Sequence, residues 1–233
     1  MGSTKSLRKK DSFPELRHTV RILSVQEHPH RKDLLNLTFS DDTSLIISRE
    51  IYLKEHLSAG TELSAEDLSS LTSVESHHRC HQASLDLLKY RPRSELELKQ
   101  KLLRKGFSAD VIDGTVRHLR DIALVDDRAF ASAWADSRKA SRSRRLIKME
   151  LHKKGIPKDM SEEATSGMDE EATALALAQK KARTLKGESP REFQVKIVNH
   201  LLRKGFDFDM SKRVARRVLN DVLETRSNHE ESA

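Results

Sequence analysis

Three pairs of basic residues, each directly followed by a glycine, are the residues whose type and spacing indicate a binding function. They lie in the strings LLRKGF (102–107), LHKKGI (151–156) and LLRKGF (201–206), and their glycines are 49 and 50 residues apart. Cations at one place in three repeated units would draw a positive stripe, which suits a polyanion or an acidic protein surface. The structural alternative is that a cation in the last helical turn only complements the helix dipole, a contribution of about 0.3–1 kcal/mol.

The elements that must position these cations are helices, because each glycine fits the left-handed residue that ends a helix. Such an ending places the first leucine of the string against the apolar residue after the glycine, so we expect contacts of Leu102 with Phe107, Leu151 with Ile156 and Leu201 with Phe206. An aspartate follows each glycine by four residues and extends the match. The sequence therefore predicts three copies of one helical unit.

The composition fits several small helical units better than one thick core. Of 233 residues, 36% are hydrophobic, 4% aromatic and 34% charged, and long charged side chains cover wide solvated helix faces. The net charge of +7 is unevenly divided, because residues 1–83 hold 11 Lys and Arg against 12 Asp and Glu, whereas residues 84–233 hold 32 against 24. The repeats carry the excess, which again indicates an anionic partner.

The single cysteine, Cys80, rules out an internal disulfide and is compatible with a reducing compartment. No stretch approaches the roughly 20 apolar residues that span a bilayer, and no apolar region follows the basic N-terminus. We expect a cytoplasmic protein that makes no membrane contact and is a monomer.

The N-terminal third has a different pattern from the rest. Residues 1–17 are expected to be a flexible tail, and residues 18–76 a small domain of strands and short helices. Alternating residues at 35–39 and the run at 44–48 predict two strands of an antiparallel sheet, with 20–25 as a weaker third.

Two short helices are expected to follow the strands, the second capped by Ser64 and Asp67. The polar tract 72–81 then predicts a hinge into the repeats. An alternative is that His77 and His81, at i,i+4 spacing, share a metal ion, but no second ligand cluster of comparable quality accompanies them.

From residue 84 onward the apolar spacing is helical. It predicts three-helix repeats over 84–125, 126–168 and 169–224, followed by a polar tail over 225–233. A serine fits the start of the middle helix in each repeat: Ser94, Ser143 and Ser189.

Paired acids, Asp126 and Asp127, begin the second repeat and could in principle serve catalysis or metal binding. We interpret them as an N-cap and a first-turn anion, because no histidine or third carboxylate is near in sequence. Phe130 and Trp134 lie four residues apart and are assigned to the core of the repeat.

Motifs of bond chemistry are missing from the sequence. It has no glycine-rich phosphate loop, no metalloprotease helix motif, no nucleophile elbow and no paired cysteines. We therefore expect no enzymatic activity, no catalytic residue, no metal and no cofactor.

The candidate binding residues are all cations. The densest run lies between the first and second helices of the middle repeat, and another follows i,i+4 spacing on the last helix. The set is Arg91, Arg93, Arg104, Lys105, Arg138, Lys139, Arg142, Arg144, Arg145, Lys148, Lys153, Lys154, Arg203, Lys204, Lys212, Arg213, Arg216 and Arg217.

Each cation that neutralises a phosphate adds about 0.9 to the salt slope on duplex DNA and about 0.7 on single strands. Weak, salt-sensitive contact with single- or double-stranded DNA is therefore expected. Aromatic residues on the basic faces are few, whereas single-strand binders use stacking platforms. The alternatives are a sequence-independent nucleic-acid-binding helical repeat protein and a helical scaffold for another protein.

The order and spacing of longer strings resemble the RecX family, the regulatory proteins of bacterial RecA recombinase. These strings are YRPRSELE (90–97), LLRKGF (102–107), LVDD (124–127) followed by Phe130-Ala131, and ELHKKGI (150–156). Specific motifs cover residues 84–165, and the third repeat and the N-terminal sheet fit less specifically.

The resemblance implies a mainly α fold, with tandem three-helix repeats in an elongated, curved array and a small N-terminal antiparallel sheet with short helices. It also implies binding in the groove of the RecA–DNA filament and inhibition of recombinase, ATPase and coprotease activities, within DNA repair, recombination and the SOS response. No motif of the family marks individual contact residues.

This chain departs from the family pattern at two places. Ala123 stands before the LVDD string, where the family usually has glycine, so the turn there can differ. The tract 159–173 is unusually acidic and polar, which leaves the end of the middle repeat open.

Overall fold

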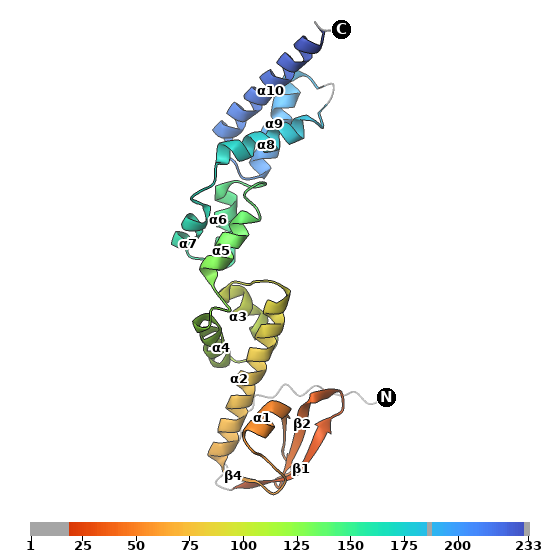
Figure 1. Ribbon diagram of the computed structural model, residues 1–233, viewed down its shortest axis with the longest axis vertical. Coiled ribbons are helices and arrows are strands. Elements are labelled where there is room, and N and C mark those ends of the chain that lie inside the picture. Colours follow the sequence, from red (N-terminus) through yellow and green to blue (C-terminus); the bar gives the residue numbers. More distant parts are fainter. Residues whose placement is uncertain (1–18, 186–187, 231–233) are drawn as a thin grey trace. The chain divides into compact units, whose positions relative to one another are not determined.

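A computed structural model describes residues 19–185 and 188–230, so the tail expected over 1–17 lies outside the described residues. The chain divides into two compact units (Figure 1). Of the described residues, one unit contains 19–86 together with 102–115, and the other contains 87–101 together with those from Val116 onward. Helical repeats and a small N-terminal antiparallel sheet confirm the predicted fold class.

The N-terminal sheet has strand order β3-β2-β1-β4, and its neighbouring strands are antiparallel. The strands are β1 (Val20–His28), β2 (Arg31–Phe39), β3 (Ser44–Ser48) and β4 (Glu62–Leu63). Ile22, Leu37 and Ile47 are fully buried between the sheet and its helices. Two register shifts in β1 explain its imperfect alternation, and β4 is too short for alternation to reveal it.

Two helices complete the N-terminal region, the short α1 (Arg49–Lys54) and the 26-residue α2 (Ala65–Tyr90). Ser64 and Asp67 form the predicted cap of α2, in which the side chain of each accepts a hydrogen bond from the backbone N–H of the other. The Ser64 N–H donates to the Asp67 carboxylate at 2.9 Å, and the Asp67 N–H donates to the Ser64 hydroxyl at 3.1 Å. The cap prediction is confirmed, but the helix is far longer than the short one expected.

The length of α2 shows that the predicted hinge over 72–81 was wrong, because the whole tract is helical. Its polar side chains serve the helix and its neighbours. The buried Glu75 carboxylate accepts hydrogen bonds from the N–H and hydroxyl of Ser48 at 2.9 and 2.7 Å, and a ring nitrogen of His77 lies 2.9 Å from the Ser73 carbonyl oxygen. Cys80 is fully buried on the same helix, so the tract is part of the fold and not a linker.

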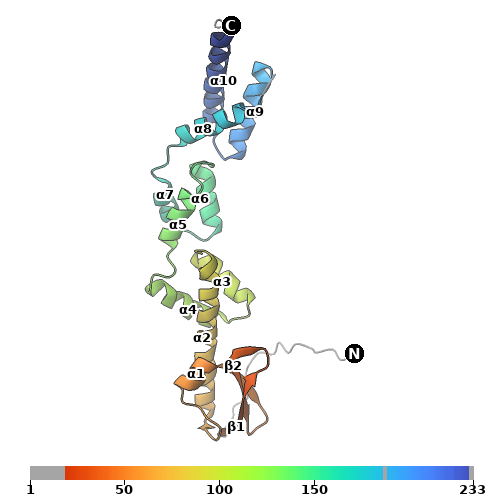
Figure 2. The same ribbon diagram turned by 45° about the vertical axis from the view of Figure 1, so that its right-hand side comes forward.

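Eight further helices follow among the described residues. They are α3 (Glu95–Arg104), α4 (Ala109–Asp121), α5 (Asp127–Asp136), α6 (Arg144–Lys153), α7 (Lys158–Thr165), α8 (Glu170–Ala182), α9 (Pro190–Arg203) and α10 (Phe208–Glu230). In both views α8, α9 and α10 lie side by side (Figure 2). The chain is helical over 225–230, where the sequence predicts the start of a polar tail.

Each of the three strings ends its helix as predicted. Gly106, Gly155 and Gly205 have φ of 92°, 83° and 91°. The N–H of the residue after each glycine bonds back to the carbonyl of the first leucine, as in Ile156 to Leu151 at 3.1 Å and Phe206 to Leu201 at 3.2 Å. This geometry satisfies carbonyls at the helix end that would otherwise lack a partner.

The second and third repeats each have a core of their own. In the second, Ile147, Leu151 and Ile156 are buried with Phe130, which stacks on Trp134 at a centroid distance of 5.7 Å. In the third, alanines of α8 pack against apolar residues of α9 and α10. Because these cores are small, the contacts between successive repeats must contribute to holding the array together.

No helix of the described residues is both long and apolar enough to cross a membrane. Within the same residues, no three His, Cys, Asp or Glu side chains are grouped as ligands of a metal ion.

Candidate polyanion and protein interface

The second and third strings contact the preceding repeat through the start of its middle helix. The Ser94 hydroxyl, at the start of α3, donates to the Lys154 carbonyl at 2.7 Å, and the Ser143 N–H, at the start of α6, donates to the Lys204 carbonyl at 2.9 Å. The C-terminal end of one helix therefore meets the N-terminal end of another, which aligns their dipoles favourably.

The glycines at these junctions also leave room for the neighbouring repeat. A Cβ on Gly155 would lie 2.6 Å from the Leu96 Cβ, and one on Gly205 would lie 2.6 Å from the Ser143 Oγ. A Cβ on Gly106 would meet nothing within 4 Å. The second and third glycines are therefore required by both backbone conformation and space, whereas the first is required by conformation alone.

Asp126 is the N-cap of α5 and Asp127 lies in its first turn, as predicted, but Asp127 also caps a second helix. Asp126 accepts from the N–H groups of its own helix α5, whereas Asp127 accepts from the Glu95 N–H of α3 at 2.8 Å. Burial raises the pKa of Asp127. Asp169 and Glu170 repeat this arrangement before α8, since Glu170 accepts from the Arg144 N–H at 2.7 Å.

Lys154, one of the predicted binding residues, is held by contacts within the chain. Its ammonium group lies 2.6 Å from a Glu97 carboxylate oxygen and 4.1 Å from the Trp134 ring centroid, with its side chain 18% exposed. Arg91 binds the same carboxylate through two nitrogens, at 3.0 and 3.2 Å. Burial alone would raise the pKa of Glu97, but the hydrogen bonds and charges of Arg91 and Lys154 outweigh it and lower the pKa to about 2.

Glu150 anchors part of the dense basic run between α5 and α6. Its carboxylate lies 3.0 Å from the Arg138 Nε, forms an ion pair with Arg142 and accepts from the Trp134 indole N–H at 3.0 Å. The Arg138 guanidinium also stacks on the Trp134 ring, 3.3 Å from its centroid. The sequence indicates Glu97 as the capping-box partner of Ser94 and gives Glu150 no separate role. Glu97 lies one turn after Ser94 and Glu150 directly precedes the second string, and these positions were the signal that could have marked their ion pairs.

Other predicted residues also have partners within the chain. Lys139 pairs with Asp136 at 2.8 Å, and Lys148 lies 3.7 Å from Glu162. Arg93 donates to a backbone carbonyl of α2, and Arg144 to the carbonyl preceding Asp169, at 3.1 and 2.8 Å. Part of the charge of the dense run is therefore neutralised locally.

The remaining predicted cations carry charge without an acidic partner among the described residues. Lys204 is half-buried, and the others are exposed. The exposed set is Arg104, Lys105, Arg145, Lys153, Arg203, Lys212, Arg213, Arg216 and Arg217. The four on α10 lie outside its buried stripe of Val214 and Val218.

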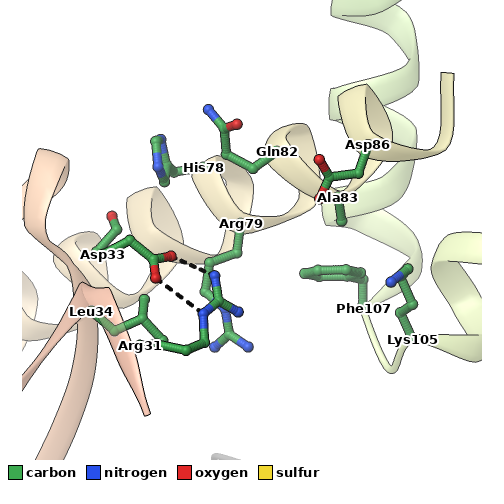
Figure 3. A pocket seen from close by; sticks show the side chains of 11 residues that line it. Arg31, Asp33, Leu34, His78, Arg79, Gln82, Ala83, Asp86, Lys105 and Phe107 are labelled. Atoms are coloured by element: carbon green, nitrogen blue, oxygen red, sulfur yellow. Dashed lines mark hydrogen bonds and ion pairs between the residues drawn. The ribbon is translucent and has the colours of Figure 1, made fainter. Parts of the chain in front are cut away.

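Lys105, from the first string, also borders a cleft of about 290 Å³ in the first compact unit. Figure 3 shows Lys105 and Phe107 on one side of this cleft and the Arg31–Asp33 ion pair on the other, with Asp86 of α2 above them. Because the lining carries carboxylates as well as cations, the cleft is a weaker anion site than an exposed set of cations alone.

The described residues form tandem three-helix units with exposed cations, so the protein is a helical repeat protein. Three family models match it in order: the first three-helix domain of RecX over residues 80–119, the second over 126–164 and the third over 169–215. The chain belongs to the RecX family.

Curated relatives match along most of the chain. A protein named Regulatory protein RecX from Clostridium botulinum (strain Alaska E43 / Type E3) is 26% identical over 205 residues, covering 86% of this chain and 97% of its own. The protein of that name from Clostridioides difficile (strain 630) is 29% identical over 206 residues, covering 85% and 96%.

Solved structures of the family have the same fold. A crystal structure of regulatory protein RecX aligns with a TM-score of 0.62 at 20% identity, covering 84% of this chain and 98% of the other. The crystal structure of RecX from Lactobacillus salivarius aligns with a TM-score of 0.56 at 26% identity, covering 62% and 97%.

Proposed function

We propose that this chain is a non-enzymatic modulator of RecA that binds the groove of the RecA–DNA filament and lowers its recombinase, ATPase and coprotease activities. It acts in the cytoplasm as a monomer and makes weak, salt-sensitive contacts with DNA. Support comes from membership of the RecX family and from relatives named as regulatory proteins that match along most of the chain.

The observation that carries the proposal is the set of exposed cations without an acidic partner among the described residues. They occur in each repeat: Arg104 and Lys105 in the first, Arg145 and Lys153 in the second, and Arg203 with the four cations of α10 in the third. Cations that no acid among the described residues neutralises keep their charge for the phosphates or carboxylates of a partner.

The predicted residues that have internal partners take a different role in this proposal. Lys154 joins the second repeat to the first through Glu97, whereas Arg138 and Arg142 pair with Glu150 inside the second repeat. Replacing any of the three would disturb the fold as well as any interface. A charge reversal that tests binding must therefore avoid them.

The first experiment is co-sedimentation with RecA filaments on single-stranded DNA. The test variant carries Arg145→Glu with Lys153→Glu, and the matched control carries Lys32→Glu with Lys54→Glu, which changes the net charge equally at exposed positions of the N-terminal region. We expect the test variant to bind filaments at least about tenfold more weakly than the control, because two cations without an acidic partner among the described residues become acids. Equal circular dichroism spectra confirm that both are folded.

Equal binding by the two variants would remove the middle repeat from the interface. Absence of co-sedimentation by the unchanged protein would contradict the proposal itself. Tight binding to naked DNA that persists near physiological salt, without an effect on RecA, would instead favour a general nucleic-acid-binding protein.

A further inference from the structure

A second cleft, of about 420 Å³, lies in the second compact unit, where the C-terminal ends of α8 and α9 meet the loop after α5. Lys180, Lys181 and Lys204 line it, and none of its described lining residues is acidic. Lys180 and Lys181 were not among the cations selected from the sequence, because they belong to no copy of the repeated string. Only the fold brings them beside Lys204.

The cations of this cleft have neutral partners or none within the part of the chain that the structure describes. The Lys181 ammonium donates to the Thr184 hydroxyl at 3.2 Å, and the described residues offer no acidic partner to Lys180 or Lys204. By contrast, Lys154, which occupies in the second repeat the position of Lys204 in the third, is paired with Glu97. The third repeat therefore presents the same lysine with its charge available.

Two helix C-termini near the cleft would by themselves favour lysines without any ligand. Their carbonyls are, however, engaged: the Lys204 carbonyl accepts from the Ser143 N–H, and the Lys181 carbonyl accepts from the Thr184 N–H. His200, which also lines the cleft, has its pKa lowered by burial and then by the charges of Lys204, Arg203 and Lys181. The field in the cleft is therefore positive despite the helix ends.

The rest of the lining selects among anions. The lining also includes the apolar residues Ala140, Ala176 and Leu177 and the hydroxyl-bearing residues Ser141 and Thr184. A carboxylate side chain would satisfy the cations but would leave these apolar residues in water. A nucleotide offers a phosphate for the cations together with a sugar and base that can cover Ala140, Ala176 and Leu177.

We propose that this cleft binds one nucleotide of a DNA strand, with its phosphate on Lys180, Lys181 and Lys204 and its sugar and base against Ala140, Ala176 and Leu177. The choice of DNA as the source of the nucleotide rests on the proposed function, since DNA is the polyanion within the filament. The site itself is defined by the lining of the cleft.

Two variants test the site by independent means. Lys181→Gln with Lys204→Gln removes two charges, and its control is Lys32→Gln with Lys54→Gln. Ala176→Phe fills the cleft without changing the charge, and its control is Ala172→Phe, another exposed position of the same helix that does not line the cleft. All four are measured by fluorescence anisotropy with a labelled single-stranded oligothymidine over a range of salt concentrations, and thymidine monophosphate is added as a competitor.

We expect the double lysine variant to bind the oligonucleotide about tenfold more weakly than its control, with a salt slope lower by about 0.7 for each phosphate that is no longer neutralised. Ala176→Phe should weaken binding similarly, whereas Ala172→Phe should not. If the free mononucleotide competed but the variants bound the oligonucleotide unchanged, the proposal that the bound nucleotide belongs to a DNA strand would be overturned.

Equal oligonucleotide binding by the cleft variants and their controls would overturn the site. The site would also be overturned if the cleft variants lost inhibition of RecA but still bound DNA normally. That result would indicate that the cleft binds an acidic protein surface. In either case the proposed function would stand if the unchanged protein still inhibits RecA. Failure of the unchanged protein to inhibit RecA would contradict the proposed function, while the oligonucleotide data would still decide the cleft.

Discussion

At the scale of single residues, the two cations of each repeated string differ in their surroundings. The first cation of the second and third strings, Lys153 or Arg203, is exposed, whereas the second, Lys154 or Lys204, is half-buried beside the preceding repeat. In the first string both Arg104 and Lys105 are exposed. One sequence motif therefore combines a structural position with a surface position, which the sequence pattern alone could not separate.

The glycines provide a graded test of the junctions. We expect Gly106→Ala to destabilise the fold by about 1–2 kcal/mol, the cost of a left-handed backbone for a residue with a Cβ. Gly155→Ala and Gly205→Ala should cost about 1–3 kcal/mol more, because the added Cβ would also force the neighbouring repeat to move. Urea unfolding followed by circular dichroism measures the difference. Equal losses at all three positions would contradict the junction geometry.

Glu97 should make stability depend on pH. Its pKa in the folded protein is about 2, below the ordinary 4.5, so its contribution is fully present above pH 4.5 and is lost as the pH falls toward 2. Glu97→Gln should therefore destabilise the protein at pH 7 by at most about 3 kcal/mol, with the loss vanishing near pH 2.

The control for this prediction is Glu192→Gln in the capping box of α9, which has no lysine of a following repeat to hold and in which glutamine can replace glutamate. Thermal unfolding of both variants across the pH range gives the comparison. If Glu97→Gln were no more destabilising than Glu192→Gln at pH 7, the Lys154 pair would not be a structural contact.

At the scale of elements, local signals predicted what depends on neighbouring residues in sequence. Caps such as Ser64 with Asp67 and the left-handed glycines were found correctly, because their hydrogen bonds stay within a few residues. The continuity of α2 was missed, since Glu75 is explained only by Ser48, 27 residues away. The contact of Asp127 with α3 and the cleft beside Lys204 were likewise set by tertiary packing, which spacing along the chain cannot show.

The turn between α4 and α5 shows what the departure at Ala123 means. Ala123 has φ of 57°, and the Leu124 N–H bonds back to the Leu119 carbonyl at 2.9 Å, so the left-handed turn is kept although the residue is not glycine. The chain therefore carries at this position the strain that glycine would avoid.

The acidic tract 159–173, which left the end of the middle repeat open, contains the end of one helix and the start of the next, because α7 ends at Thr165 and α8 starts at Glu170.

The strain at Ala123 predicts that Ala123→Gly stabilises the protein by about 0.5–1 kcal/mol. The substitution removes the cost of a left-handed backbone at a residue with a Cβ, and the greater entropy of glycine in the unfolded chain offsets part of that gain. Ala133→Gly, at an exposed position within α5, should have the opposite sign and cost about 1 kcal/mol. Both are measured by chemical unfolding. A loss of stability in Ala123→Gly comparable to that in Ala133→Gly would contradict the account of this turn.

At the scale of the whole molecule, fold class and family were predictable because three strings in fixed order specify them. The list of binding residues was not, because a cation in the sequence does not reveal whether an acid such as Glu97 or Glu150 already neutralises it. The proposed role in RecA regulation depends on those cations that remain available after folding, together with the cleft of the third repeat.

The most direct test of that role is the rate of ATP hydrolysis by RecA on single-stranded DNA, measured while the protein is added from substoichiometric to stoichiometric amounts. We expect the rate to fall with added protein, and Arg145→Glu with Lys153→Glu to weaken this inhibition more than the Lys32→Glu with Lys54→Glu control. A rate that stays constant up to stoichiometric amounts of the unchanged protein would contradict the account.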